Sequence, residues 1–586
     1  WITERLKNDP EIRELYDDDV AVYIGTWEIR CPHCGRWTPA IGNFWLARVK
    51  DGKHYTRLAY MKPEKNGDEV EMKVIDLNEI MDDISKANVD GSEIIFEGEN
   101  YVKTVEEAVR DGKLKQSDVK IDGNTVIFEV PSANIESRRS QLTCLMCGNV
   151  IKYADENGNH HMKLKNGDFY VKFALRKYHE GDERFARQRL LVKVKVKDGD
   201  LIFEPATKED SEKLWKAKDK VREMLEKGDQ DVPSEAIPLY ENRRITPILS
   251  AEKWYQFFNP RQLLTLIKIV RLIREAGKRI EEEKIREGWS EEKAFEYAEA
   301  VATYLSMAFL NFSRFQTVSN IWDSTSWKPV KHIFSMRGII VSWNWGDVHP
   351  TYENFITCWQ YFMRKLFKAL EYLTSALSSQ RTLADFTENS IKVLQGDATS
   401  LNLGEKFDVI VTDPPYADDV PYTELSDFYY VWLKRALSDV ENGKLIPRFH
   451  KEAFFKKIGP KWVEIKTQWQ EFAKKEVSTN PGRFMEDENK KEKAVQHFEN
   501  LFSQAFVAMR EHLKDDGILV TYYAHTNPES WINLIEAGWK RAKLQITRAV
   551  PVTTESETSI VNRGKMSLDT SIVVVWRMQK EEKTVQ

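Results

Sequence analysis

The stretch Phe407-Asp408-Val409-Ile410-Val411-Thr412, followed at once by Asp413-Pro414-Pro415-Tyr416, decides how the C-terminal part of this chain is interpreted. The first six residues are mainly apolar, rich in β-branched side chains, and stopped by prolines, which is typical of a strand buried in a parallel sheet. In an open α/β sheet, ligands bind at the carboxyl ends of the strands. The tetrapeptide therefore marks a candidate binding site, although Asp and Pro also favour ordinary β-turns.

The tetrapeptide offers the groups that a planar, amine-bearing base requires. The carboxylate of Asp413 and a backbone carbonyl can accept hydrogen bonds from an exocyclic NH2 group. Pro414 and Pro415 fix φ and carry no competing N–H, so the carbonyls keep their direction. The ring of Tyr416 can stack on a base that has turned out of its helix. We interpret these four residues as the catalytic, base-binding residues.

A second motif precedes the tetrapeptide by one short connection. Residues 391–398 predict a short strand that ends in Gly396-Asp397-Ala398. Further strands are expected at 517–523, 544–552 and 570–576, with a helix over 529–537. Together these patterns predict an α/β sheet of about five strands.

Four of the five cysteines form two matching Cys-x-x-Cys-Gly motifs, at Cys31/Cys34 and Cys144/Cys147. Two intervening residues let both sulfur atoms face one ion, and the following glycine permits the tight turn. Four thiolates complete a tetrahedral zinc site with no open position, which makes it structural rather than catalytic. The long separation of the pairs requires the intervening insertion to fold outward. The fifth cysteine, Cys358, lies in a helical apolar pattern and is expected in the core.

Length and composition limit which architectures, partners and compartments are possible. At 586 residues with 41% hydrophobic content, the chain can form several cores. Charged residues make up 31% but the net charge is only −5, so overall charge does not indicate a polyanion partner. No apolar stretch is long enough to span a membrane, and a cytoplasmic compartment is expected. Because the chain begins at Trp1, an upstream piece is also expected.

The patterns divide the chain into successive segments. Helical spacing of apolar residues is strongest from Pro260 to about 315, where the proline suits the first turn of a helix. We predict an acidic helical lead-in (1–20), a split zinc ribbon with a β-rich insertion (21–165), an α/β insertion (166–245), a mostly helical domain (246–389), and the α/β sheet (390–586), itself interrupted by an insertion (440–495).

This last insertion mixes basic and aromatic residues. Between Lys444 and Lys475 there are nine Lys/Arg residues against three Glu, interleaved with Phe449, Phe454, Phe455, Trp462, Trp469 and Phe472. Such a mixture suits phosphate contacts and base stacking, so the segment is a candidate target-recognition region. An ordinary amphipathic insertion explains the same composition nearly as well.

These motifs together resemble the prokaryotic adenine-specific DNA methylases that contain a zinc ribbon. The resemblance covers most of the chain and includes both cysteine motifs, Asn259-Pro260-Arg261-Gln262, Gly396-Asp397-Ala398, Asp413-Pro414-Pro415-Tyr416 and Glu424-Leu425-Ser426-Asp427-Phe428. It implies a Rossmann-like methyltransferase sheet, S-adenosylmethionine as cofactor and the N6 amine of adenine in DNA as acceptor. It places Asp397, Ala398 and Asp413 at the cofactor, with His525 and Glu555 as further pocket candidates.

One expected element is missing from the sequence. No Phe-x-Gly-x-Gly cluster occurs among the 27 glycines, although such a turn holds the methionine part of the cofactor in these enzymes. The sheet is therefore expected to be incomplete, lacking its first two strands. An N-terminal segment or a partner polypeptide would supply them.

Two alternatives stay open. The same tetrapeptide serves RNA methyltransferases that modify the N2 amine of guanine. The missing cofactor motif would also suit a non-catalytic, zinc-ribbon DNA-binding subunit of a modification or defence complex.

Overall fold

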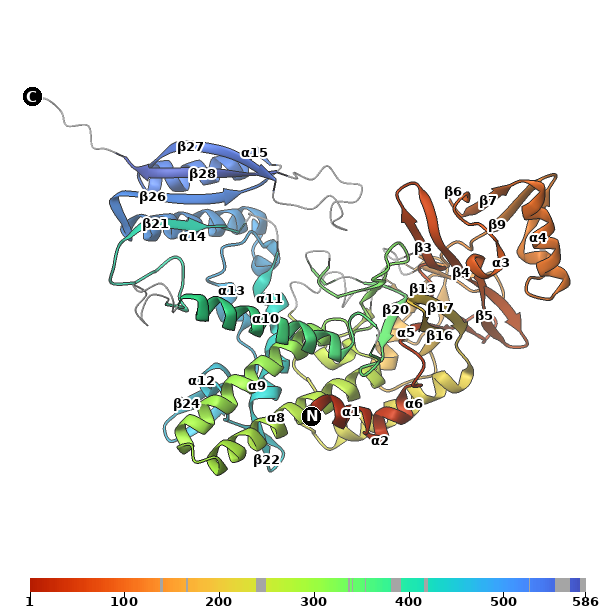
Figure 1. The fold of residues 1–586 in the computed structure, drawn as a ribbon, viewed down its shortest axis with the longest axis horizontal. Coiled ribbons are helices and arrows are strands. Elements are labelled where there is room, and N and C mark those ends of the chain that lie inside the picture. The colour runs from red at the N-terminus through yellow and green to blue at the C-terminus, as the bar shows by residue number, and fades with distance from the viewer. Residues whose placement is uncertain are drawn as a thin grey trace, which may run out of the picture.

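The computed structural model describes residues 1–136, 141–164, 167–238, 249–335, 338–339, 341–353, 355–380, 392–415, 420–525, 527–553 and 570–579. Figure 1 shows the last strands of the chain at one end of the molecule and the β-rich N-terminal part at the other, with long helices between them. No described helix has both the length and the apolar character that a membrane crossing would require.

The central sheet of the N-terminal part joins strands from three of the predicted segments. Strand β1 (Val22–Arg30) pairs antiparallel with β16 (Ala186–Lys197), β2 (Trp37–Pro39) and β20 (Trp345–Val348), and β17 (Asp200–Pro205) continues the sheet beyond β16. Every residue of β1 except its last is buried, so the predicted segments share one core.

The residues between the two cysteine pairs fold into two further small sheets. The first contains β3 (Trp45–Asp51), β4 (His54–Asn66) and β5 (Glu69–Asp76), and the second contains β6 (Asn88–Asp90), β7 (Glu93–Glu97), β9 (Thr125–Glu129) and β8 (Lys120–Asp122). Helix α4 (Glu99–Arg110) packs on the second sheet. Figure 1 shows these elements projecting from the central sheet, as the wide spacing of the cysteines required.

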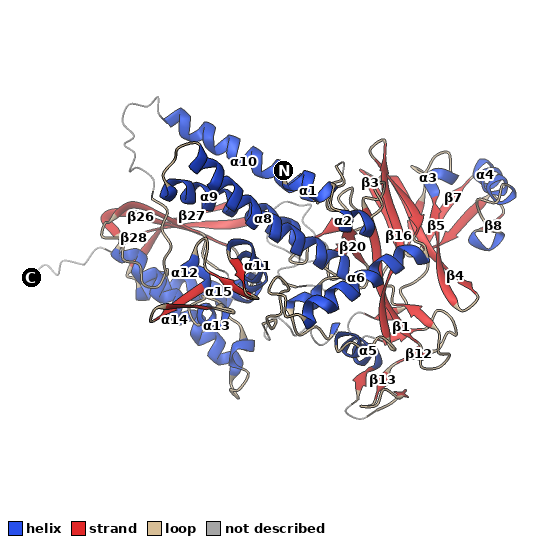
Figure 2. Ribbon diagram, turned by 90° about the horizontal axis from the view of Figure 1, so that it is seen from below, coloured by secondary structure: helices blue, strands red, loops and turns tan. Residues whose placement is uncertain are grey.

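Helices flank the central sheet and lead away from it. They are α1 (Ile2–Lys7), α2 (Pro10–Leu15), α5 (Tyr170–His179), α6 (Lys208–Glu226), α8 (Pro260–Arg286), α9 (Glu291–Ser313), α10 (Trp359–Gln380) and α11 (Tyr422–Leu437). Figure 2 shows α8, α9 and α10 side by side. Helix α8 begins where the sequence predicted, because Asn259 caps it, Pro260 fills its first position and Gln262 closes a reciprocal capping box.

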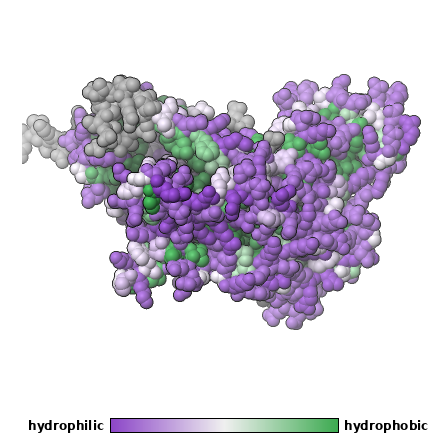
Figure 3. All heavy atoms as spheres, turned by 60° about the horizontal axis from the view of Figure 1, so that its bottom comes forward, coloured by the Kyte–Doolittle hydropathy of each residue, from purple (hydrophilic) through white to green (hydrophobic). Residues whose placement is uncertain are grey.

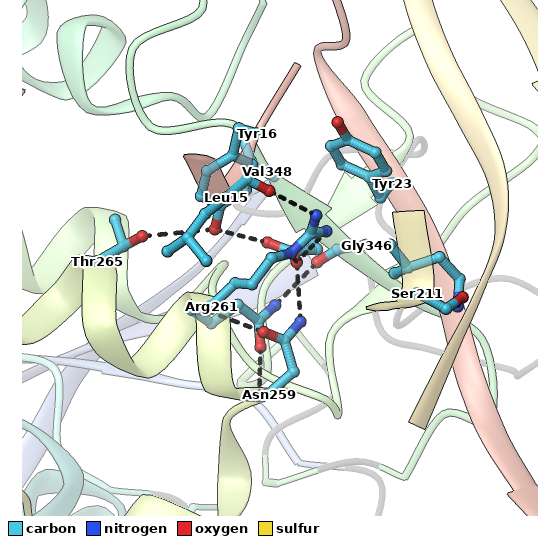
Figure 4. A network of polar contacts seen from close by, with 12 residues as sticks. Leu15, Tyr16, Tyr23, Ser211, Asn259, Arg261, Thr265, Gly346 and Val348 are labelled. Atoms are coloured by element: carbon cyan, nitrogen blue, oxygen red, sulfur yellow. Dashed lines mark hydrogen bonds and ion pairs between the residues drawn. The ribbon is translucent and has the colours of Figure 1, made fainter. Parts of the chain in front are cut away.

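A fully buried ion pair ties α8 to the central sheet (Figure 4). Arg261 donates to Asp347 of β20 from Nε (3.0 Å) and Nη2 (2.7 Å). Asn259 Nδ2 (2.9 Å) and the hydroxyl of Tyr16 (3.0 Å) donate to the same carboxylate. The guanidinium carbon also lies 4.2 Å from the ring centre of Tyr23. Both charges are thus compensated inside the core, where an unpaired charge is costly.

Asp347→Ala should therefore destabilise the protein strongly. It leaves the Arg261 guanidinium buried without its counter-ion, which costs about 3–5 kcal/mol of unfolding free energy. Urea unfolding monitored by tryptophan fluorescence measures this loss. As a matched control, Glu287→Ala removes the exposed partner of Lys284 (2.7 Å) and should cost less than about 0.5 kcal/mol. Equal losses in the two variants would contradict this account of the ion pair.

The C-terminal sheet has four strands in the order β21 (Phe407–Thr412), β26 (Leu513–Tyr523), β28 (Thr570–Met578) and β27 (Leu544–Thr553). Strands β21 and β26 are parallel, whereas β28 runs antiparallel to both of its neighbours. Helices α14 (Lys490–Glu511) and α15 (Pro528–Ile535) contribute to the apolar layer on one face of the sheet. The predicted strands at 407–412, 517–523, 544–552 and 570–576 are confirmed in position.

Two expectations about this sheet are wrong. The run 407–412 was expected to be buried on both faces, but β21 lies at the edge, and the side chains of Val409 and Val411 are 52% and 62% exposed. Residues 392–396 form no strand, and Val393 is 93% exposed. The face of the molecule in Figure 3 shows apolar side chains at the surface of the same lobe, beside the residues drawn in grey. An apolar run predicts a strand, but its burial depends on what packs against it.

Candidate metal centre and candidate base-binding site

The four cysteines of the two Cys-x-x-Cys motifs meet at one point. Their sulfur atoms all lie within 4.8 Å of one another, with Cys31 Sγ 3.8 Å from Cys147 Sγ and Cys34 Sγ 3.9 Å from Cys144 Sγ. Cys31 follows the end of β1, and Cys144 follows the end of β11 (Gln141–Thr143). The four side chains could therefore bind a metal ion, as the sequence predicted.

The two motifs adopt the same backbone geometry. In the first, Gly35 N donates to Cys31 O (2.9 Å) and Cys31 N donates to Arg36 O (2.8 Å). The second repeats both bonds, from Gly148 to Cys144 and from Cys144 to Asn149, at 2.8 and 2.9 Å. Gly35 and Gly148 have φ of +71° and +75°, a conformation that favours glycine. Each turn thereby directs its two sulfur atoms toward the same point.

The thiols of the cluster interact with one another. The hydrogen bond with Cys144 raises the pKa of the Cys31 thiol, and burial raises the pKa of the Cys34 thiol. The pKa of the Cys144 thiol is lowered to about 4, mainly because the thiol of Cys31 donates a hydrogen bond to it. The backbone N–H groups of Met146 and Cys147 lower this pKa further. His33 contacts the carbonyl oxygen of Val150 through Nε2 at 3.3 Å and is not one of the clustered metal-ligand candidates.

The fifth cysteine lies apart from the cluster. The side chain of Cys358 is fully buried, as expected for a core residue. Burial raises the pKa of its thiol. Cys358 is therefore a packing residue and serves as an internal comparison for the four metal-ligand candidates.

The candidate base-binding tetrapeptide begins directly after β21, at the carboxyl end of the parallel strand. Asp413 and Pro415 are exposed, whereas Pro414 is buried. Tyr416 lies outside the described residues, as does Glu555. The position of Asp413 is the one at which open parallel sheets bind ligands.

Asp397 and Ala398, two of the expected cofactor residues, lie on the connection before β21. Asp397 Oδ1 accepts hydrogen bonds from Thr399 N (2.9 Å) and Thr399 Oγ1 (2.7 Å), and these bonds lower the pKa of its carboxyl group. Its other oxygen lies 4.0 Å from Lys475 Nζ of the basic insertion. Ala398 is exposed. A cavity of about 540 Å³ along α14 includes Thr399 in its wall but neither Asp397 nor Asp413.

The pocket candidate His525 has a structural role at the start of α15. Its Nδ1 accepts a hydrogen bond from Asn527 N (2.9 Å), and its carbonyl oxygen accepts one from Trp531 Nε1 (3.0 Å). These bonds hold the turn that leads from β26 into the helix.

Helix α11, which follows the tetrapeptide, carries buried charges that sequence analysis left without a role. Glu424 is fully buried and accepts hydrogen bonds from Arg483 Nε (2.9 Å) and Nη2 (2.7 Å). Lys434 is equally buried, between Glu235 (2.8 Å) and Glu464 (2.7 Å). These pairs fix α11 against the helical domain and the insertion. Charged residues at the apolar positions of this helix were the sequence feature from which the buried ion pairs could have been predicted.

Asp427 of α11 is buried, and no side chain in the described part of the chain forms an ion pair with it. It accepts hydrogen bonds from Trp254 Nε1 (2.9 Å) and from the hydroxyl of Thr467. Burial raises the pKa of its carboxyl group to about 6, and the charge of Glu235 adds to the shift. Because the folded pKa lies above the unfolded value, the protein loses stability as the pH rises from about 4 to about 6, and the loss is complete above pH 6.

Asp427→Asn should remove this pH-dependent loss. The amide can accept from Trp254 and donate to Thr467, so the local hydrogen bonds persist without a buried charge. At pH 7.5 the variant should be about 2–3 kcal/mol more stable than the wild type, and near pH 4 the two should be equal. Urea midpoints measured across this pH range test the prediction. An equal difference at every pH would contradict it.

In the basic and aromatic insertion, most of the aromatic side chains are buried and most of the basic side chains are exposed. It contains β22 (Asp439–Glu441), β23 (Lys444–Ile446), α12 (Lys451–Phe454), β24 (Phe455–Ile458), β25 (Lys461–Glu464) and α13 (Trp469–Ala473). Four of the aromatic side chains expected to stack on bases are buried instead: Phe449, Phe454, Phe455 and Trp469. That interpretation is wrong for these four, because a small insertion needs them as its core. The basic residues are exposed except Arg448, which pairs with Glu281.

Comparisons with known proteins found no match for this chain, either among protein-family models or among curated proteins and solved structures.

Proposed function

We propose that this chain is the base-binding part of an S-adenosylmethionine-dependent methyltransferase that modifies the N6 amine of adenine in DNA. The observation that carries the proposal is the position of Asp413-Pro414-Pro415 at the carboxyl end of β21, a parallel strand. The chain between β21 and β26 contains α11 and α14, which makes the parallel crossover that such sheets require.

The residues of this chain would bind and orient the acceptor amine. Asp413 is exposed, so its carboxylate can accept a hydrogen bond from the NH2 group of a base that has left its helix. The carbonyl of Pro414 would accept the second hydrogen bond, and Tyr416 would stack on the base. The cofactor supplies the methyl group. Catalysis by these residues is then positioning and electrostatic stabilisation of the nitrogen as its charge develops.

The described residues provide only part of a cofactor site. Asp397 already bonds Thr399, and Asp413 is the sole other cofactor candidate with a carboxylate in the described chain. We therefore assign the missing Gly-rich turn to an additional segment or a partner polypeptide. The exposed side chains of Val409 and Val411 support this assignment, because parallel strands are normally covered on both faces.

The cysteine cluster has a separate, structural role in this proposal. Four thiolates at tetrahedral spacing with no further ligand fit Zn²⁺, and they leave no open position for substrate. The ion would hold both ends of the long insertion to the central sheet.

A methylation assay of the complete assembly tests the proposed function. The chain, co-purified with the polypeptide that completes its sheet, should transfer labelled methyl groups to the N6 position of adenine in duplex DNA. Incorporation only into tRNA or rRNA, at the N2 amine of guanine, would replace the proposal with its RNA alternative. The non-catalytic alternative is favoured by the local contacts of Asp397, and it predicts DNA binding without incorporation.

A further inference from the structure

The hairpin formed by β24 and β25 presents a face that no other part of the described chain covers. The pairs Lys456↔Val463 and Ile458↔Lys461 lie opposite each other across its two strands. All four side chains are exposed, and those of Ile458 and Val463 reach 58% and 46%. Alternation along each strand places these four residues on one side of the ribbon.

The positive charges of this hairpin are not neutralised within the protein. Lys456, Lys457 and Lys461 are exposed, and none forms an ion pair with a residue that the structure describes. By contrast, Lys474 nearby pairs with Glu471 at 2.9 Å. A chain with net charge −5 thus concentrates three unpaired cations on a ribbon of eight strand residues. Such a local excess fits an anionic partner.

The base of the hairpin is rigidly attached to the helix that follows the base-binding tetrapeptide. Phe454 and Phe455 are buried, and Ile465 N donates to Phe454 O at 2.8 Å. On α11, the hydroxyl of Tyr430 donates to Ile465 O (2.8 Å), and buried Lys434 pairs with Glu464 (2.7 Å). The turn is tight, with Gly459 at φ +60°. A ligand on the hairpin would therefore be held in a fixed position relative to α11.

We infer that the β24–β25 hairpin binds duplex DNA in or along the major groove. The major groove of B-form DNA admits a two-stranded ribbon, whereas the major groove of A-form RNA is too deep and narrow for side chains to read. Lys456 and Lys461, which share a face with Ile458 and Val463, would contact phosphates, and Lys457 on the opposite side of the ribbon would add to the positive potential. Ile458 and Val463 would contact sugars or thymine methyl groups. Two apolar side chains between lysines form too small a patch for a membrane or a hydrophobic protein interface.

The hairpin would hold the DNA substrate of the proposed methyltransferase. That the polymer is DNA rests on the proposed function. Its test measures binding, not catalysis. The fluorescence anisotropy of a labelled DNA duplex of about three helical turns is titrated with the full chain at several salt concentrations, in parallel with duplex RNA of the same sequence.

The triple variant Lys456→Ala/Lys457→Ala/Lys461→Ala should weaken duplex DNA binding at least tenfold at about 0.1 M salt. It should also lower the slope of log K against log salt by about 2–3, because each lost phosphate contact contributes about 0.9. Ile458→Ser/Val463→Ser should weaken binding a few-fold with an unchanged slope. The control Lys103→Ala/Lys113→Ala/Lys120→Ala removes the same charge from exposed positions in the insertion that contains α4 and should leave both quantities unchanged.

The results of this test distinguish a failure of the hairpin inference from a failure of the proposed function. If the chain binds duplex DNA and the hairpin variants bind it equally well, the hairpin inference is overturned while the DNA methyltransferase proposal stands. Tighter binding of duplex RNA than of duplex DNA overturns the inference and favours the RNA alternative. Absence of binding to either polymer contradicts both. Circular dichroism melting of each variant confirms that it has folded.

Discussion

Replacing Asp413 by Ala should reduce methyl transfer by the complete assembly about 10²–10³-fold, the usual cost of removing one aligned hydrogen-bonding group from a catalytic site. The carboxylate is the one ionised acceptor in the Asp413-Pro414-Pro415 sequence, and its position after β21 directs it toward the ligand edge of the sheet. Because Asp413 is an exposed residue, the change in thermal stability should be small compared with the loss of activity, and a melting curve of the variant checks this. Labelled methyl incorporation into DNA at saturating substrate measures the effect.

Asp408, in the strand that precedes Asp413, provides a matched control. It is an exposed aspartate in β21 whose carboxylate pairs with Lys514 at 2.9 and 3.0 Å. Asp408→Ala should leave methyl transfer within about twofold of the wild type, since it removes only a surface ion pair. Full activity in Asp413→Ala would show that the tetrapeptide is not catalytic. The chain would then be better explained as a DNA-binding subunit.

Local sequence patterns predicted the two turns of the candidate metal site and the strand that precedes the tetrapeptide, but they wrongly predicted a strand before Asp397. The cysteine spacing and the glycine after each pair predicted two identical turns, and the structure shows the same backbone hydrogen bonds at Gly35 and Gly148. The start of α8 was readable from Asn259 and Pro260, because capping depends on the first few residues of a helix. Strand positions at 517–523 and 544–552 followed from apolar runs of the right length.

Properties that depend on distant partners were not predictable from the same patterns. The run 407–412 reads as a buried strand, but β21 has a described neighbour only at β26, so one edge stays open. Phe454 and Phe455 read as stacking residues, but they form the core of a small insertion. The pairing of Arg261 with Asp347 joins positions 86 residues apart, and no local pattern encodes such a contact.

The buried charges of α11 link the candidate base-binding site to the basic insertion. The helix begins close after the tetrapeptide, and its Glu424 and Lys434 are fixed by ion pairs to Arg483 and Glu464. Both partners belong to the chain inserted between the parallel strands. The insertion thus anchors the helix that follows the candidate active site, while its exposed lysines remain available to a polyanion. The insertion would then both fix α11 beside the candidate site and position the substrate.

Removing the metal should have the largest effect on stability. We expect one zinc ion per chain, bound by Cys31, Cys34, Cys144 and Cys147. Without it, buried thiolates must protonate or separate, and the ends of the long insertion lose their common anchor. Cys144→Ser should lower the zinc content to near zero and cost about 5 kcal/mol or more of unfolding free energy, since structural zinc sites contribute about 10–16 kcal/mol in isolated fingers. Elemental analysis and thermal unfolding measure the two effects.

Cys358 separates loss of the metal from loss of a thiol. It is fully buried, as Cys144 nearly is, but it is not among the four clustered cysteines. Cys358→Ser should therefore keep one zinc ion per chain and lose only the packing of a small side chain, about 1–2 kcal/mol. A strong chelator should destabilise the wild type and Cys358→Ser alike, but it should not further destabilise Cys144→Ser. If Cys144→Ser retained both its zinc and its stability, the assignment of Cys144 as a ligand of the structural metal site would be wrong.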